Sequence, residues 1–466
     1  MGKPSPNLLT DPVAATLLRL AAPMVLGIGA VLLFGVVDTF WVAQLGDAQL
    51  AAMSYTFPVT AIVMNIGMAL GLGTTAATAR AIGTGDQPRV AQLATHGLWL
   101  ALLAVVSVVA VAYTTLDATF TALGASAATL PLVRAYMEPW FIGALLMVLT
   151  MVGNGAIRAG GDTRTPAQMM MLAGLLNAGL TPVLMFGLGP FAPMGIRGAA
   201  VATAIAWAVS LVVAVSILHF REHLLLFRLD PSAVRRSWRD ILHVGLPAMG
   251  TNLLYPLSAA VITRTVAVHG DAAVAGFGVA SRVEQVALIG IFALSTAITP
   301  FVGQNHGARQ CERVREAARF SLKASLLWGL GSTAVLVLGS GPLASLFSDG
   351  PGVAEVIRSY WLIVAVCYGL LGVASLVNAI FNALGQPLRS AQLTGIRLLA
   401  LLLPMALIGA QAGGLTGLFV GISAAYGLGG VVAYAMVHRM IDRVEEQQSL
   451  ELAAAQAGQD PVASGL

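Results

Sequence analysis

Long apolar stretches dominate the chain, and short segments rich in Gly, Pro and Asp separate them. An apolar stretch of 18 residues or more is long enough for a helix to cross a bilayer. Breaks such as 83–90 and 159–166 carry residues that end helices. The pattern predicts twelve membrane-spanning helices, at 14–44, 51–80, 92–114, 129–157, 166–189, 195–218, 241–268, 274–304, 318–340, 354–382, 389–410 and 414–437.

The composition supports a membrane protein and excludes a water-soluble one. Of the 466 residues, 57% are hydrophobic and 10% are charged, whereas soluble domains contain about 25% charged residues. A single soluble core of this size could not bury so much apolar surface. We therefore expect an all-α integral membrane protein with lipid around most of its surface.

The positions of Lys and Arg predict the orientation in the membrane. Most of the 25 basic residues fall on one side of the predicted helices or at helix ends facing it, and Arg397 is counted with them. Because basic loops stay in the cytoplasm, both termini and segment 219–240 are expected there, and no cleavable signal peptide is expected. The expected units are a six-helix bundle at 1–218, a cytoplasmic linker at 219–240, a second six-helix bundle at 241–440 and a cytoplasmic tail at 441–466.

The two halves of the chain repeat each other. A constant shift of 224 residues places Pro23 on Pro247, and beyond residue 168 the shift becomes 219. The 224-residue shift also pairs Gly46 with Gly270, Arg134 with Arg358, Tyr136 with Tyr360, Asn154 with Asn378, and Gly161 with Gly385. Six helices per half insert both halves in the same direction, so a pseudo-two-fold axis lies along the membrane normal. That arrangement places a cavity between the bundles and suits alternating access.

Asp38 is the clearest ionisable residue within a predicted span. A charged side chain at the centre of a bilayer costs roughly 2.5–3.5 kcal/mol on insertion scales. No Lys or Arg lies within one helical turn of Asp38, so a local ion pair does not explain it. Apolar surroundings favour the uncharged carboxyl, which suits proton or cation exchange; a purely structural hydrogen bond is the alternative.

Further polar side chains lie on other predicted helices of the first half. Asn154, Asn177, Thr181 and Thr203 could line a substrate or cation pocket, although each alone is more typical of a hydrogen bond between helices. Tyr136 could present its ring and hydroxyl to a cavity, or share a structural role with Tyr360.

The second half carries different groups. Ile262 takes the position equivalent to Asp38, while Arg264, Arg282 and Glu284 lie on the first two helices of that half. A Glu284–Arg264 ion pair between helices would need no function; a coupling or substrate role for Glu284 is the alternative. Glu138, nearer the outer interface, is a weaker candidate.

Prolines mark positions where these helices could bend. Pro23 lies in the same predicted helix as Asp38, and Pro247 and Pro256 lie in its counterpart. Because proline removes a backbone donor, a charge change at Asp38 could be linked to bending at Pro23; a static kink is equally compatible.

The sequence lacks the motifs of several other classes. It contains no phosphate-binding loop for ATP, no metal-ligand or hydrolase motif, and nothing typical of nucleic-acid binding. Cys311 and Cys367 are too few for a disulfide framework. We therefore expect neither an enzyme nor a bound cofactor.

At this point the chain resembles the multidrug and toxic compound extrusion (MATE) family, and within it the branch of DNA-damage-inducible protein F. The resemblance covers roughly residues 12–440. It rests on Pro23 followed by VDTFWVAQLG with Asp38, on NGAIRAGGDTRTP at 154–166, GIRGAAVAT at 195–203 and PFVGQNHGA at 300–308.

The resemblance implies a V-shaped pair of six-helix bundles and proton- or sodium-driven antiport. It also implies a first-half pocket around Asp38, with Tyr136, Asn154, Asn177 and Thr203 as companions and Pro23 as the hinge. Where the family usually has a second acidic residue, this chain has Thr181. A single carboxylate weakens the case for a sodium site and favours exchange of one proton.

The expected function is therefore export of small, often cationic, amphipathic organic molecules across the bacterial inner membrane, with a monomer sufficient. The alternatives are a flippase for lipid-linked precursors and an intramembrane enzyme. The flippase would need several cationic residues, for which only Arg264 and Arg282 are candidates, and the enzyme would need a paired catalytic constellation that the sequence does not show.

Overall fold

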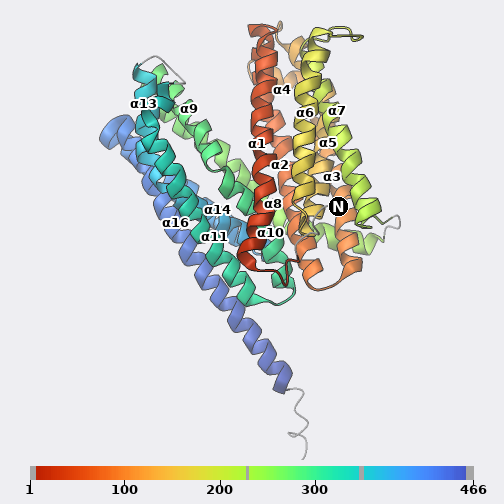
Figure 1. The fold of residues 1–466 in the computed structure, drawn as a ribbon. Coiled ribbons are helices and arrows are strands. Elements are labelled where there is room, and N and C mark those ends of the chain that lie inside the picture. Colours follow the sequence, from red (N-terminus) through yellow and green to blue (C-terminus); the bar gives the residue numbers. More distant parts are fainter. Residues whose placement is uncertain (1–6, 227–229, 346–350, 458–466) are drawn as a thin grey trace, which may run out of the picture.

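The computed structural model describes residues 7–226, 230–345 and 351–457, and these residues form helices and connecting turns without a strand (Figure 1). Six long helices make up the first half. Their bounds are α1 Val13–Ala43, α2 Asp47–Gly83, α3 Gln87–Thr114, α5 Leu130–Ala159, α6 Arg164–Phe186 and α7 Ile196–Ser216, with short α4 Leu116–Ala122 before α5 and π-helical η1 Ile217–Arg221 after α7.

The second half contains more breaks in its helices. Its elements are α8 Pro231–Ala267, α9 Asp271–Ala287, α10 Ile289–Gly307, α11 Cys311–Leu338, α12 Ser340–Ser345, α13 Pro351–Val364, η2 Ala365–Cys367, α14 Tyr368–Ala383, α15 Pro387–Gly395, η3 Ile396–Leu402 and α16 Leu403–Ala457. Three of the predicted spans are therefore built from more than one helical segment.

Twelve crossings account for these elements. Nine described helical segments are long and apolar enough to span a membrane by themselves, and the pair α9 and α10 forms a tenth span bent by 44°. One of the nine, Pro387–Met440, contains two legs that meet at a kink at Gly413 and Gly414. The remaining span is α8, whose 37 residues begin with a charged segment. The twelve-helix expectation is confirmed.

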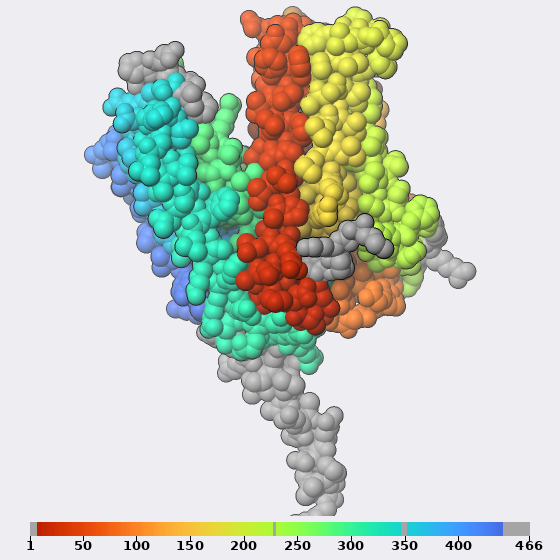
Figure 2. All heavy atoms as spheres, in the orientation of Figure 1, coloured from red at the N-terminus to blue at the C-terminus, as the bar shows by residue number. Residues whose placement is uncertain are grey.

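The two halves form separate bundles that diverge from one end. Figure 1 shows α1, α6 and α7 in one group and α9, α11, α13 and α16 in the other, with the groups converging near the start of α1. In Figure 2 the same groups are solid masses with an open cleft between them at the other end. At the converging end α1 packs against α10 and α2 packs against α8, so each bundle supplies two helices to the interface.

The repeat extends to backbone conformation. Gly195 has φ +56° and ψ −139°, and its counterpart Gly414 has φ +59° and ψ −140°. Gly46 and Gly270 have φ of +118° and +94°, and Gly161 and Gly385 have φ of +88° and +72°. L-residues with a side chain rarely adopt positive φ, so the repeated glycines mark repeated turns.

Two expected boundaries differ in the structure. The predicted linker 219–240 is helical from Pro231, because Asp230 caps α8 by accepting a 2.9 Å hydrogen bond from the Ser232 amide and Pro231 occupies the first turn. The helix of the last span also continues through the predicted tail as far as Ala457. Residues 227–229 and 458–466 of these two segments lie outside the described residues.

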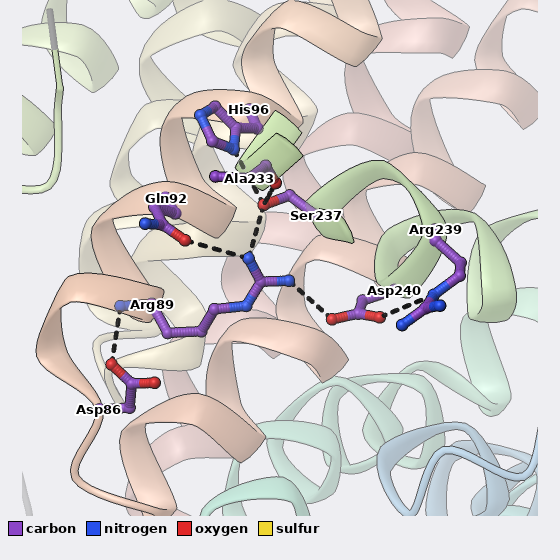
Figure 3. Close-up of polar contacts among 8 residues, drawn as sticks. All are labelled: Asp86, Arg89, Gln92, His96, Ala233, Ser237, Arg239 and Asp240. Atoms are coloured by element: carbon purple, nitrogen blue, oxygen red, sulfur yellow. Dashed lines mark hydrogen bonds and ion pairs between the residues drawn. The ribbon is translucent and has the colours of Figure 1, made fainter. Parts of the chain in front are cut away.

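A polar network joins the start of α8 to α3 at the converging end (Figure 3). Arg89 donates to Asp240 at 2.7 Å and to Ser237 at 2.9 Å, and His96 lies 2.9 Å from the same Ser237 hydroxyl. A surface pocket of about 350 Å³ adjoins Arg89 and Asp240. The beginning of α8 is therefore attached to the first bundle.

Two equivalent hydrogen bonds, one donated by each bundle, join the bundles. Arg80, near the end of α2, donates to the Ala383 carbonyl at 3.0 Å, and Gln304, near the end of α10, donates to the Ala159 carbonyl at 2.6 Å. The 224-residue shift relates Arg80 to Gln304 and Ala159 to Ala383. The last carbonyls of a helix have no partner within it, so each bundle satisfies a helix end of the other.

Two equivalent glycines allow this close approach. A Cβ atom added to Gly83 would lie 2.0 Å from the Gln304 carbonyl oxygen, and one added to Gly307 would lie 2.3 Å from the Arg80 carbonyl oxygen. Because both obstacles are backbone atoms, no side-chain rotation could relieve the overlap.

We expect Gly83→Ala to destabilise the contact between α2 and α10, and to lower the free energy of unfolding by about 1–3 kcal/mol, the usual range for overpacking. Thermal unfolding of the purified protein in detergent would measure it. Gly179→Ala is the matched control, because nothing lies within 4 Å of the added methyl. If both variants unfold at the wild-type temperature, the close crossing does not hold the bundles together.

The turn between α5 and α6 is held by Asp162. Its carboxylate accepts a 2.9 Å hydrogen bond from the Thr165 amide and further bonds from the Thr165 hydroxyl and Arg221. Burial by itself would raise the pKa of Asp162, but these hydrogen bonds outweigh burial and lower the pKa below its ordinary value.

Since the folded-state pKa is lowered, the ionised Asp162 stabilises the fold at neutral pH, and that stabilisation is lost as the pH falls below about 4. We expect Asp162→Asn to unfold at a lower temperature than wild type at neutral pH, with the difference shrinking in acid. Melting temperatures measured across this pH range would show it, with Glu312→Gln as an exposed control. A constant difference at all pH values would contradict this role.

Candidate functional site

Asp38 lies inside the first bundle, against α6. Its side chain is partly buried, in the last two turns of α1, and its carboxylate oxygen lies 3.4 Å from the Thr181 hydroxyl, which donates. Thr181 is fully buried. Within the described residues no ion pair joins Asp38 to a basic side chain. Asp38 is therefore a carboxyl group with one weak neutral donor.

Two other candidates lie beside this contact. Asn177 is one turn before Thr181 on α6 and donates a 2.9 Å hydrogen bond to the Thr203 hydroxyl on α7, which in turn donates to the Ala199 carbonyl. Tyr136, on α5, is buried and close enough to Asp38 for an electrostatic interaction. Four helices thus contribute to one polar cluster, defined here as Asp38, Tyr136, Asn177, Thr181 and Thr203.

Asn154 does not share the position of Tyr136. The two residues are on α5 but 18 positions apart, which corresponds to about 27 Å along a helix. Asn154 is buried, and its carboxamide oxygen has no hydrogen-bond partner among the described residues. The structure therefore separates Asn154 from Tyr136 by most of the helix length.

Pro23 lies within continuous helix α1, on the converging side of Asp38. Fifteen residues separate them, or about 22 Å of helix. The α1 helix packs against α6 of its own bundle and α10 of the other. Any bend at Pro23 would therefore change a contact between bundles as well as the position of Asp38.

In the second bundle Glu284 has partners that the sequence did not indicate. It accepts a 2.7 Å hydrogen bond from the Tyr360 hydroxyl and a 3.3 Å hydrogen bond from the Tyr426 hydroxyl. The expected Glu284–Arg264 pair is wrong: among the described residues no ion pair joins them, and both Arg264 and Arg282 are exposed. The tyrosines were hidden from sequence analysis because they lie 76 and 142 residues away.

Arg397 is the residue that sequence analysis misplaced. It was counted among the basic residues at helix ends, but it is 5% exposed and lies ten residues into the span that begins at Pro387. It belongs to the π-helical turn η3, and such turns are frequent at functional sites. Its Nη1 atom has no hydrogen-bond partner among the described residues. The π-helical turn could have been suspected only from a lone arginine in an apolar run.

The family comparison matches both halves of this chain. The model described as MatE matches residues 23–183 and again residues 247–408. The chain belongs to the MatE family. The two matches begin at Pro23 and Pro247, so they reproduce the internal repeat and confirm the resemblance to the family as a whole.

Curated relatives of this MatE protein include transporters with different names. It is 37% identical over 440 residues to the FAD transporter of Shewanella oneidensis, covering 94% of this chain and 97% of the relative. It is 26% identical over 397 residues to the probable multidrug resistance protein NorM of Thermotoga maritima, covering 84% of each chain. The MatE protein is therefore a transporter and not an enzyme.

Solved structures agree with the twelve-helix, two-bundle fold. A variant of the Vibrio cholerae MATE transporter VcmN matches with a TM-score of 0.89 and 28% identity, over 92% of this chain and 97% of that chain. The Pyrococcus furiosus transporter of the MOP superfamily matches with a TM-score of 0.85 and 26% identity, over 94% of this chain and 98% of that chain.

The Asp38–Thr181 contact generates a prediction for this MatE protein. Removing the hydroxyl in Thr181→Val leaves the ionised Asp38 without its donor, and the loss of about 1 kcal/mol corresponds to a roughly fivefold slower transport. Transport of a fluorescent substrate by cells expressing each variant would measure it. Thr39→Val is the control, because the Thr39 hydroxyl donates to its own helix at Gly35. Equal loss in both variants would show that Thr181 does not act through Asp38.

Proposed function

We propose that this transporter exports small amphipathic organic molecules in exchange for protons that bind at Asp38. The observation that carries the proposal is the environment of that carboxyl. Asp38 has a neutral hydroxyl beside it at 3.4 Å and no basic partner among the described residues, so neither charge state is fixed by an ion pair.

Thr181 also bears on the identity of the coupling ion. A sodium site in oxygen ligands gains from several carboxylates, whereas a proton needs only one acceptor. The cluster contains one carboxylate with neutral oxygens from Asn177, Thr181 and Thr203. A proton is therefore our first choice, and sodium is the alternative tested below.

We further propose that the protein is in a bacterial inner membrane, with both termini and the converging end on the cytoplasmic side. The basic residues gathered near that end, including Arg89, Arg236 and Arg239 at the surface pocket, support this orientation by the positive-inside rule. The open cleft then faces outward (Figure 2), and one chain contains both bundles.

The proposed cycle uses the charge of Asp38. A proton arriving from outside neutralises the carboxylate, weakens its hold on Thr181 and on a bound cation, and frees α1 to bend near Pro23. The membrane potential supplies about 2.3 kcal/mol per charge per 100 mV, and the pH gradient adds about 1.4 kcal/mol per unit. Substrate leaves outward and the proton leaves inward.

A second candidate substrate class is flavin dinucleotides. It is favoured by the identity to the Shewanella oneidensis FAD transporter, which at 37% exceeds the 26% to the Thermotoga maritima relative. A dinucleotide carries a pyrophosphate, and the exposed guanidinium groups of Arg264 and Arg282 in the second bundle offer it cationic partners.

The test uses wild type and Asp38→Asn in proteoliposomes with an imposed pH gradient. We expect wild type to move substrate against its gradient and acidify the vesicle interior, and the variant to lose at least tenfold of that proton-driven transport. Ethidium, FAD and a lipid-linked pyrophosphate serve as separate substrates, and a sodium gradient replaces the pH gradient in a parallel series.

Each outcome has a definite meaning. Proton-driven transport that is unchanged in Asp38→Asn would exclude the coupling role. Movement of FAD alone, lost in Arg264→Gln with Arg282→Gln, would establish the second candidate, and movement of the lipid alone would overturn both. Asp47→Asn, at the start of α2, is the control for loss of an acidic residue.

A further inference from the structure

The second bundle encloses a carboxyl group that the proposed function does not use. Glu284 on α9 accepts hydrogen bonds from Tyr360 on α13, at 2.7 Å, and from Tyr426 on α16, at 3.3 Å. Tyr360 is 2% exposed and stands edge-on between the rings of Phe277 and Phe419. Three helices therefore hold the carboxylate inside the bundle.

Other ionisable groups surround these hydrogen bonds. Tyr368, on α14, is fully buried and lies close enough to Glu284 to act on it electrostatically. Arg397, in η3, and Tyr255, on α8, act on Tyr426. Three tyrosines thus face Glu284, and behind Tyr426 lie Tyr255 and the buried guanidinium of Arg397.

This environment supports Glu284 in either charge state. Phenol hydroxyls that donate to a carboxylate favour its ionised form. Burial in an apolar bundle favours the neutral form. No basic side chain among the described residues forms an ion pair that would keep Glu284 ionised. Protonation of Glu284 therefore breaks no ion pair among the described residues.

The location of Glu284 connects it to the rest of the protein. It lies in the last turn of α9, and its carbonyl accepts the Leu288 amide at the break where α9 and α10 bend by 44°. The α10 helix packs against α1 and α2 of the first bundle. A change in how tightly Glu284 holds α13 and α16 can alter this bend and the contact between bundles.

Both bundles place a tyrosine beside a carboxyl group. Tyr136 and Tyr360 occupy matching positions in the repeat, and each lies beside a carboxyl group, Asp38 in the first bundle and Glu284 in the second. The carboxyl comes from the first helix of one bundle and the second helix of the other, since Ile262 occupies the position that matches Asp38. Each bundle thus has one acid–tyrosine site.

We propose that Glu284 is a second proton-binding site, held by Tyr360 and Tyr426 at the bend between α9 and α10, so that each cycle moves two protons. The two-proton cycle rests on the proposed function, since it requires proton-driven transport. Proton binding at Glu284 does not, because it can be measured without any substrate.

The first experiment measures proton binding directly in the purified full-length protein. The infrared absorbance of protonated carboxyl groups is followed during a pH titration of wild type, Glu284→Gln, Asp38→Asn and the double variant. We expect each single variant to lose one titrating carboxyl and the double variant to lose two. Glu138→Gln, which changes a half-buried residue paired with Arg134, should leave both signals in place.

A second variant tests the tyrosine contacts and guards against a misfolded Glu284→Gln. Tyr360→Phe with Tyr426→Phe keeps the carboxyl but removes both donors, so its signal should persist and its midpoint should move to higher pH. A midpoint equal to wild type, or a Glu284→Gln spectrum with all titrating carboxyls intact, would overturn the proposal and leave Glu284 a structural hydrogen-bond acceptor.

The transport arm separates this proposal from the proposed function. In proteoliposomes, the substrate gradient that balances a given proton gradient gives the number of protons per substrate. We expect that number to fall from about two to about one in Glu284→Gln. Failure of Asp38→Asn to affect transport would overturn the proposed function and the two-proton cycle with it, but would leave proton binding at Glu284 standing. An unchanged ratio in Glu284→Gln would overturn the two-proton cycle alone.

Discussion

The crossing of α2 and α10 at the converging end is the contact on which the rest of the structure depends. Gly83 and Gly307 bring the two helices to backbone contact, and Arg80 and Gln304 each satisfy the carbonyl end of a helix in the other bundle. A buried backbone carbonyl without a hydrogen-bond partner is costly, so these two side chains make the approach possible. The bundles can then diverge at the other end without coming apart.

That geometry also explains why each bundle keeps its polar groups inside. With the cleft open between them, neither bundle can use the other to cover a charged residue near the open end (Figures 1 and 2). Asp38 is enclosed by α5 and α6, and Glu284 by α13 and α16, each within its own bundle. Each bundle therefore encloses one carboxyl group beside a tyrosine. Asp38 is on α1 and Glu284 is at the break before α10, and both of these helices reach the interface.

The two halves of the chain are more alike in backbone conformation than in side-chain chemistry. The matched glycines have nearly equal positive φ values because a turn that only glycine tolerates leaves no freedom of substitution. At the interface the equivalent positions hold different residues, Arg80 and Gln304, because either side chain can donate a hydrogen bond to a carbonyl oxygen of the other bundle. The acidic residue lies on the first helix of one bundle and on the second helix of the other, because the interior of a bundle can be reached from any of its helices.

The sequence by itself determined the twelve crossings, the two halves and the family, and it singled out Asp38 as a candidate site residue. These follow from local quantities: the length of apolar runs, the spacing of repeated residues, and the cost of a carboxyl group in lipid. Only the tertiary structure decided which polar groups meet. It joined Asp38 to Thr181 across 143 residues, replaced Arg264 by Tyr360 and Tyr426 at Glu284, placed Asn154 far from Tyr136, and buried Arg397. Helix rotation and crossing set these contacts, and in an apolar helix no hydrophobic stripe reveals which face turns inward.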